Sequence, residues 1–267
     1  MLSGLNTIYP KAFYLLIYNY LTYDRLWSNN SQNLRQLRDI VPIKSSLIGI
    51  SHITIQIKNF MRKIALFLLS LTVMAIQAQD IALLTPETGK GLNTMLAFNQ
   101  RRSTREFSTK ELSVQDLSNL LWATMGINRQ DNKLTAPSCL NKQEIRLFAL
   151  TGKGAYEYMP LSHSLRHVAD GDFRPVVGGQ QTFVNDAPLC LVMVADMDKF
   201  GSTDSRSMTM AAIDAGIVTE NACIAAAGLG FATVPRASMD SAKLQEILGL
   251  TENQIPLMNT PIGYFKE

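Results

Sequence analysis

The chain has few of the residues that build disulfide frameworks or metal centres. Its 267 residues include three cysteines, which are far apart and form no Cys-x-x-Cys pair. This number and spacing exclude a disulfide-rich fold and a cysteine zinc site. Two of the three histidines, His163 and His167, are four residues apart and close to Asp170. Such a pair shares a metal only if a helix carries it, and we expect solvated hairpin histidines and no metal site.

The chain also lacks a strong net charge. Lys and Arg number 25 against 22 Asp and Glu, a formal net charge of +3. Residues 1–78 hold eight basic and two acidic residues, so residues 79–267 hold 17 and 20. A net negative main part argues against a nucleic-acid-binding protein. Aromatic residues at 8% and only ten prolines argue against disorder.

Residues 61–78 have the pattern of a secretory signal peptide. Met61 is followed by Arg62 and Lys63, then by an uncharged apolar run of 13 residues, 64–76. That run is shorter than the roughly 20 residues that span a membrane, and Ala78 is a small residue at the expected cleavage point. We therefore expect a secreted or periplasmic protein whose mature form begins at Gln79 or Asp80 and has no stable membrane insertion.

Sixty residues precede this signal, although a signal peptide begins at the initiator. Residues 1–60 show no sustained period, and we interpret them as an over-extended reading frame or an unstructured segment, with translation starting at Met61. The alternative is a genuine extension that turns residues 64–76 into a membrane anchor. In both cases the working domain is 79–267.

Helical and strand patterns alternate in residues 79–267. Ser113 with Asp116 resembles a capping box that starts a helix ending near Gly126. The other predicted elements are a hairpin at 145–158, a buried strand at 189–195, a helix at 204–227 stopped by Gly228, a helix at 243–248 stopped by Gly249, and a strand at 255–265 broken by Pro256 and Pro261. This order predicts an α+β fold with a mixed sheet.

Three clusters carry residues suited to a ligand. Residues 101–105, Arg-Arg-Ser-Thr-Arg, combine guanidinium and hydroxyl groups that suit a phosphate dianion, and a short helix is expected before them. Residues 136–143 form a loop with backbone and amide groups that can bond a flat heteroaromatic ring. Residues 214–230 are a run of small residues that allows close backbone approach. A solvated charge run, an ordinary loop and tight helix packing are the alternative interpretations.

Together, the clusters resemble the nitroreductase family of FMN flavoproteins. The matching residues are Arg-Arg-Ser-x-Arg-x-Phe at 101–107, Pro-Ser-x-x-Asn-x-Gln at 137–143, the 214–230 helix, and Pro-Ile-Gly-Tyr at 261–264. The resemblance spans about residues 95–265. Gly-Ala-Tyr-Glu-Tyr at 154–158, with the His-Ser-Leu that follows, is similar to the subgroup that contains azoline dehydrogenases.

The resemblance implies a mainly antiparallel sheet flanked by helices, a homodimer, and FMN at the dimer interface. The ribityl phosphate would be held by Arg101, Arg102, Ser103 and Arg105, with Lys266 as the one further cation near the end. From the partner subunit, the flavin would be approached by Pro137, Ser138, Cys139 and Asn141. The flavin ring would lie beside Val234, Pro235 and Arg236, where a backbone N–H can bond N5.

The resemblance further implies that flavin carries the chemistry, without a catalytic side chain. We expect ping-pong transfer through N5 to a small acceptor such as a nitroaromatic or a quinone. An exported enzyme is separated from cytoplasmic NAD(P)H, so the alternative is a flavin-dependent dehydrogenase or oxidase with another redox partner. An alternative of another class is a binding protein that keeps the cleft without FMN, since the chain ends soon after Lys266.

The start at Met61 predicts that the native protein contains no peptide from the region between Thr7 and Lys58. Mass spectrometry of protein purified from its own compartment measures this directly. Recovery of peptides from that region would contradict the reassigned start.

Overall fold

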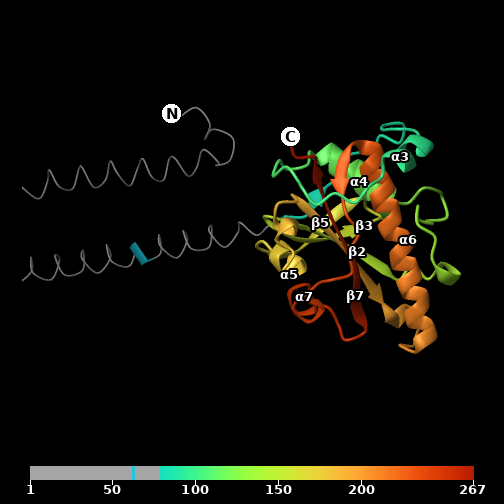
Figure 1. The fold of residues 1–267 in the computed structure, drawn as a ribbon. Coiled ribbons are helices and arrows are strands. Elements are labelled where there is room, and N and C mark those ends of the chain that lie inside the picture. The colour runs from blue at the N-terminus through green and yellow to red at the C-terminus, as the bar shows by residue number, and fades with distance from the viewer. Residues whose placement is uncertain (1–61, 64–78) are drawn as a thin grey trace, which may run out of the picture. The chain divides into compact units, whose positions relative to one another are not determined.

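The computed structural model describes residues 62–63 and 79–267 (Figure 1). The predictions for residues 1–60 and for the signal peptide lie outside the described residues, apart from Arg62 and Lys63. The chain divides into two units, and the second, Gln77–Glu267, contains every element discussed below.

A seven-stranded sheet forms the centre of this unit, in the spatial order β1-β4-β3-β2-β5-β7-β6. The strands are β1 (Ile81–Ala82), β2 (Ile145–Thr151), β3 (Gly154–Met159), β4 (Ser164–Asp170), β5 (Leu189–Asp196), β6 (Phe231–Thr233) and β7 (Gln254–Tyr264). Each neighbouring pair is antiparallel. The α+β class is confirmed, and the single parallel pairing among the described residues is the isolated bridge between Ser103 and Thr233.

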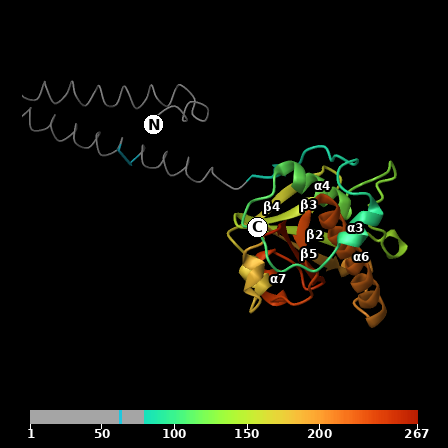
Figure 2. The same ribbon diagram turned by 45° about the horizontal axis from the view of Figure 1, so that its top comes forward.

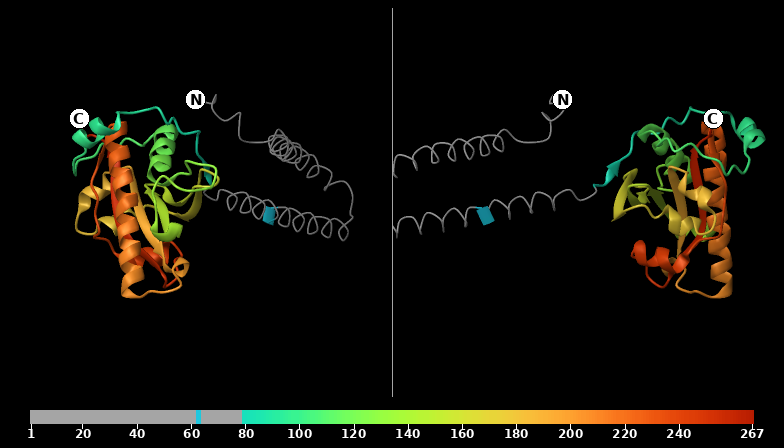
Figure 3. Two further views of the ribbon diagram at one scale, coloured as in Figure 1. Left: turned by 90° about the vertical axis from the view of Figure 1, so that its right-hand side faces the viewer. Right: turned by 60° about the vertical axis from the view of Figure 1, so that its left-hand side comes forward.

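Helices cover both faces of the sheet (Figures 1 and 3). One face carries α3 (Thr94–Gln100), α4 (Val114–Met125) and α6 (Ser205–Leu229), and the other carries α5 (Arg174–Gly178) and α7 (Ser241–Ile247). Leu147 of β2 packs in the α4–α6 core, while its neighbour Phe148 packs in the α5–α7 core. Because both faces are covered, the predicted buried strand is confirmed: Leu189–Ala195 are all at most 1% exposed.

Local sequence signals place α4 correctly. Ser113 is its N-cap, and the Ser113 Oγ accepts a hydrogen bond of 3.1 Å from the Asp116 N–H. Gly126 ends the helix as predicted. The hairpin of β2 and β3 is also confirmed, with the turn at residues 152–153.

The predicted stop of α6 at Gly228 is wrong, because the helix continues to Leu229 and ends at Gly230. Gly230 has the left-handed conformation (φ +82°) that glycine adopts freely. The Gly228 carbonyl accepts a 2.9 Å bond from the Leu92 N–H, and this close approach requires a glycine at Gly91, where a Cβ would lie 2.8 Å from the Gly228 carbonyl oxygen. Figure 2 shows α3 beside this end of α6. Among the described helices, α6 alone has the length and apolar composition of a membrane span, and half of that window is buried in the domain.

The predicted break in the last strand is also wrong, because β7 is continuous over 11 residues. Its register with β5 shifts between Met193 and Val194, so that Pro256 lies beside an irregularity. A proline without an N–H is tolerated at such a position. The helix predicted at 243–248 is confirmed as α7, two residues earlier at its start, with Gly249 just after it.

Candidate functional site

Residues 101–105, here called the arginine segment, are fixed against the end of the sheet. Ser103 pairs with Thr233 of β6, and the Thr104 N–H donates a 2.9 Å bond to the Thr233 carbonyl. Before the segment, α3 ends at Arg101, whose N–H donates to the Ala97 carbonyl at 2.8 Å. The short helix expected here is therefore confirmed, and α3 and β6 together determine where the guanidinium groups lie.

The guanidinium groups of the arginine segment form no ion pair with any carboxylate of the described residues. Arg102 and Arg105 are exposed, and the Arg102 guanidinium lies 5.6 Å from the centroid of the Phe265 ring. In the part of the chain that the structure describes, no carboxylate lies within 4 Å of Arg101, Arg102 or Arg105. An anion such as a phosphate is therefore the natural complement of this surface.

Arg236 adds a buried cation to the same region. It is 7% exposed, and its guanidinium donates to the Asn259 Oδ1 at 2.6 Å and the Gln181 Oε1 at 3.1 Å. The carbonyls of Val177 and Gly178 complete its neutral set of acceptors. Burial lowers the pKa of Arg236, and the nearby charge of Arg105 lowers it further. Arg236 is therefore a buried cation that is held by neutral acceptors alone among the described residues.

The backbone at residues 234–236 differs in part from the prediction. The Arg236 N–H donates a 2.8 Å bond to the Asn259 carbonyl, and Pro235 has no N–H. Neither residue therefore has a free N–H for flavin N5, and the Arg236 side chain points into the protein. Sequence reasoning missed Asn259, which is fully buried and pairs with Arg236 through both backbone and side chain.

The loop at residues 137–143 (the 137–143 loop) contains three non-glycine residues with positive φ. Leu140, Asn141 and Gln143 have φ values of +51°, +54° and +49°. Non-glycine residues with positive φ store strain that surrounding contacts must offset. Two such contacts are the bond from the Gln143 N–H to the Ser138 Oγ (2.9 Å) and the bond from the Cys139 N–H to the Asp214 Oδ2 (2.7 Å).

Within one chain the 137–143 loop does not share a cleft with the arginine segment. The loop is bound to Asp214, near the middle of α6, whereas the arginine segment lies at β6, just beyond the end of α6. Asp214 and Leu229 are separated by 15 residues of helix, or about 22 Å. The predicted contribution of Pro137, Ser138, Cys139 and Asn141 to the site therefore needs a second copy of the chain.

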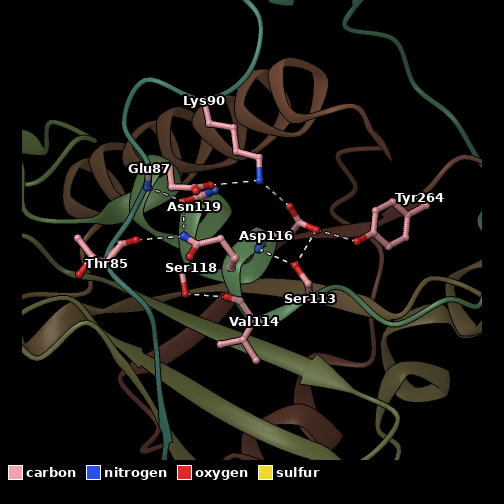
Figure 4. Close-up of polar contacts among 10 residues, drawn as sticks. Thr85, Glu87, Lys90, Ser113, Val114, Asp116, Ser118, Asn119 and Tyr264 are labelled. Atoms are coloured by element: carbon pink, nitrogen blue, oxygen red, sulfur yellow. Dashed lines mark hydrogen bonds and ion pairs between the residues drawn. The ribbon is translucent and has the colours of Figure 1, made fainter.

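The C-terminal tail is held by a polar network on α4 (Figure 4). The Tyr264 hydroxyl donates to the Asp116 Oδ2 at 2.7 Å, and the Lys90 Nζ lies 3.6 Å from the Asp116 Oδ1. Burial and the Asp116 carboxylate both raise the pKa of Tyr264. Lys266, two residues beyond Tyr264, is exposed.

The remaining titratable candidates are structural. His163 lies in a turn and His167 in β4, so the helical spacing required for a shared metal is absent. The His163 ring bonds to the Tyr158 hydroxyl at 2.8 Å. No group of three or more potential metal ligands occurs in the described part of the chain. Cys190 and Cys223 are buried, and burial raises the pKa of each thiol to about 12, which leaves Cys139 as the half-buried thiol.

Two cavities lie elsewhere in the domain. One, of about 340 Å³, is lined by residues that include Glu111, Tyr156 and Arg174, and another, of about 170 Å³, lies between α4, α6 and residues 86–97. None of the predicted site residues lines either cavity, although the smaller cavity is lined by other residues of α3 and α6.

Comparison with known proteins identifies the family. The profile of the nitroreductase family matches residues 98–264. The chain belongs to the nitroreductase family. A candidate nitroreductase of Methanocaldococcus jannaschii is 27% identical over 61% of this chain and 87% of its own length. The crystal structure of a candidate nitroreductase from Ralstonia eutropha is 33% identical, covers 71% of this chain and 90% of its own, and has a TM-score of 0.67.

A further nitroreductase-fold enzyme shows the same architecture. The NADPH:FMN oxidoreductase of Vibrio harveyi, complexed with NAD⁺, is 21% identical over 66% of this chain and 70% of its own, with a TM-score of 0.52. As a nitroreductase, the chain is an FMN-dependent oxidoreductase. The residues present fit that cofactor, because Arg101, Arg102 and Arg105 flank Ser103 in the sequence and none of the three forms an ion pair with a described carboxylate, which leaves them for a phosphate dianion.

The contacts of Arg236 predict a stability effect. Replacing Arg236 with Lys keeps the charge but loses the fork that reaches four acceptors. We expect the free energy of unfolding to fall by about 1–3 kcal/mol, measured by urea denaturation, because buried acceptors lose their donors. The same change at exposed Arg206 is the control and should shift it by less than about 0.5 kcal/mol. Equal effects at the two positions would contradict the anchoring role.

Proposed function

We propose that this protein is an exported, homodimeric FMN-dependent nitroreductase that reduces a small acceptor such as a nitroaromatic or a quinone. The observation that carries the proposal is the cluster of guanidinium groups at the end of β6, which no described carboxylate neutralises. A flavin bound at this cluster supplies hydride and electron transfer through its N5.

The arginine segment and β6 bind and orient the cofactor. Arg101, Arg102 and Arg105 provide charge-assisted donors for the phosphate, and the Ser103 hydroxyl adds a further donor. Because Ser103 and Thr104 are held by Thr233, the cation cluster is formed before the phosphate arrives. Such preorganisation reduces the entropy lost on binding. Lys266, on a tail fixed through Tyr264, is the remaining cation that can approach the phosphate.

Two features of the chain support a site formed by two copies. The 137–143 loop lies about 22 Å along α6 from the arginine segment, so a partner placed end to end on α6 brings its loop to the other chain's cofactor. Large apolar side chains lie exposed on the surfaces such a partner would cover. They are Met95 and Phe98 on α3, Ile213 on α6, and Leu140, which is 85% exposed, on the loop. Exposed apolar side chains of this size favour an interface.

The electron donor follows from the compartment. If residues 61–78 direct export, cytoplasmic NAD(P)H does not reach the enzyme. The predicted signal peptide therefore favours a second version, in which the protein oxidises a small molecule or peptide and passes the electrons to a non-nicotinamide partner. Rapid bleaching of the flavin by NADPH in a stopped-flow experiment supports the reductase, and the absence of bleaching supports the dehydrogenase or oxidase.

Arg105 tests the phosphate site. Replacing Arg105 with Ala should weaken FMN binding by about 10- to 100-fold, because a charge-assisted hydrogen bond contributes about 1.5–3 kcal/mol. Titration of the protein with FMN, followed by flavin fluorescence, measures the change, and circular dichroism checks that the fold is retained.

The matched control replaces Arg206, an exposed arginine on the first turn of α6, with Ala. Its FMN affinity should equal that of the unmodified protein. Unchanged affinity in the Arg105 variant would remove Arg105 from the site.

A further inference from the structure

Glu144 is a fully buried carboxyl group directly after the 137–143 loop. It is 0% exposed, and neither of its carboxylate oxygens has a hydrogen-bond donor among the described residues. An ionised carboxylate in such a place is very costly. The position therefore favours a neutral, protonated side chain, which has a hydrogen to donate.

An acceptor for that hydrogen is adjacent. Asp214, 4% exposed, lies on α6, which packs against both β2 and the turn at Cys139–Asn141, and its carboxyl group is close enough to raise the pKa of Glu144. The Asp214 Oδ2 already accepts the 2.7 Å bond from the Cys139 N–H, so its other oxygen is left for Glu144. One carboxylate and one carboxylic acid form a charge-assisted O–H···O⁻ bond, whereas two carboxylates repel each other.

The other described charged groups around Glu144 do not form a hydrogen bond or an ion pair with its carboxyl group. Lys199 donates its hydrogen bond to the Gln143 carbonyl and lowers the pKa of Glu144 only slightly. Asp196, at the end of β5, donates its N–H to the Glu144 carbonyl at 2.9 Å and contributes a further negative charge. The pKa of Glu144 is raised to about 7. Burial is the main cause of this rise, and the Asp214 carboxyl group is the next cause that acts in the same direction.

We propose that Glu144 and Asp214 share one proton, and that this proton holds the 137–143 loop in the strained conformation that faces the partner's flavin. Glu144 and Asp214 are then positioning residues, which act through the Cys139 N–H. The role of the loop at the flavin rests on the proposed function, whereas the shared proton does not.

The pH dependence has a definite sign. Glu144 has a raised pKa in the closed loop seen here, and in this proposal the opening of the loop exposes Glu144 and returns its pKa towards the ordinary value of 4.5. Closure is therefore fully favoured below pH 4.5 and weakens as the pH rises to about 7, by up to about tenfold for each pH unit. Above pH 7 the effect levels off.

Glu144→Gln is the decisive variant, because the Gln amide donates to Asp214 as the protonated acid does, yet does not titrate. The readout is the rate at which a maleimide labels Cys139, the half-buried thiol, between pH 5 and pH 8. The ratio of the unmodified rate to the variant rate cancels the titration of the thiol. We expect this ratio to rise up to about tenfold per pH unit and to level off near pH 7.

Two further variants sharpen the experiment. Glu246→Gln changes an exposed carboxylate on α7 and should give the pH profile of the unmodified protein. Asp214→Asn removes the neighbouring anion, so the pH profile should move to lower pH. The contradicting result is a ratio of the unmodified labelling rate to the variant rate that does not change from pH 5 to pH 8. If it stays constant for both Glu144→Gln and Asp214→Asn, the proposal of a shared proton is wrong.

The dissociation constant of FMN, measured over the same pH range, separates this inference from the proposed function. Affinity that falls with rising pH in the unmodified protein but not in Glu144→Gln supports both. If neither protein binds FMN while the labelling ratio changes as expected, the proposed function fails and the shared proton stands. If both bind FMN with the same affinity at every pH, the loop has no positioning role at the flavin.

Discussion

Positive charge without an internal counter-charge is the constraint on which the proposed site depends. Burial lowers the pKa of Arg236, and the positive charge of Arg105 acts in the same direction. Burying Arg236 among neutral acceptors is costly, and the cost is offset by five hydrogen bonds to four acceptors and by the packing of its guanidinium over the Phe183 ring.

The long helix α6 connects the arginine segment and the 137–143 loop, the two parts of the candidate site. Its C-terminal end leads at Gly230 into β6, which holds the arginine segment, and Asp214 near its middle holds the 137–143 loop. A rigid helix fixes the separation of these two groups, so that one chain holds them apart. In the homodimer that we propose, each would belong to a different flavin site.

Local chemistry made much of the fold predictable from the sequence. The Ser113 cap of α4, the β2–β3 hairpin and the buried strand β5 depend on neighbouring residues or on continuous apolar patterns. The stop at Gly228 failed because two glycines lie near the same helix end, and only Gly230 takes the left-handed conformation that ends α6. The break in β7 failed because a register shift with β5 accommodates Pro256.

The candidate site was predictable only where residue type alone indicates chemistry. The guanidinium and hydroxyl groups of the arginine segment lie together in the sequence, whereas Asn259 and Arg236 are 23 residues apart and meet only through strand pairing. Glu144 and Asp214 are 70 residues apart and meet only because α6 packs on the sheet. Contacts of this kind depend on tertiary structure, and a single sequence contains no local pattern for them.

The central claim is that the arginine segment binds the phosphate of a flavin. Its most direct test compares the affinities of the protein for FMN and for riboflavin, which lacks the phosphate, in titrations at the same salt concentration. We predict that FMN binds at least about tenfold more tightly, since each charge-assisted bond to the phosphate contributes about 1.5–3 kcal/mol. Equal affinities for the two flavins would contradict the account.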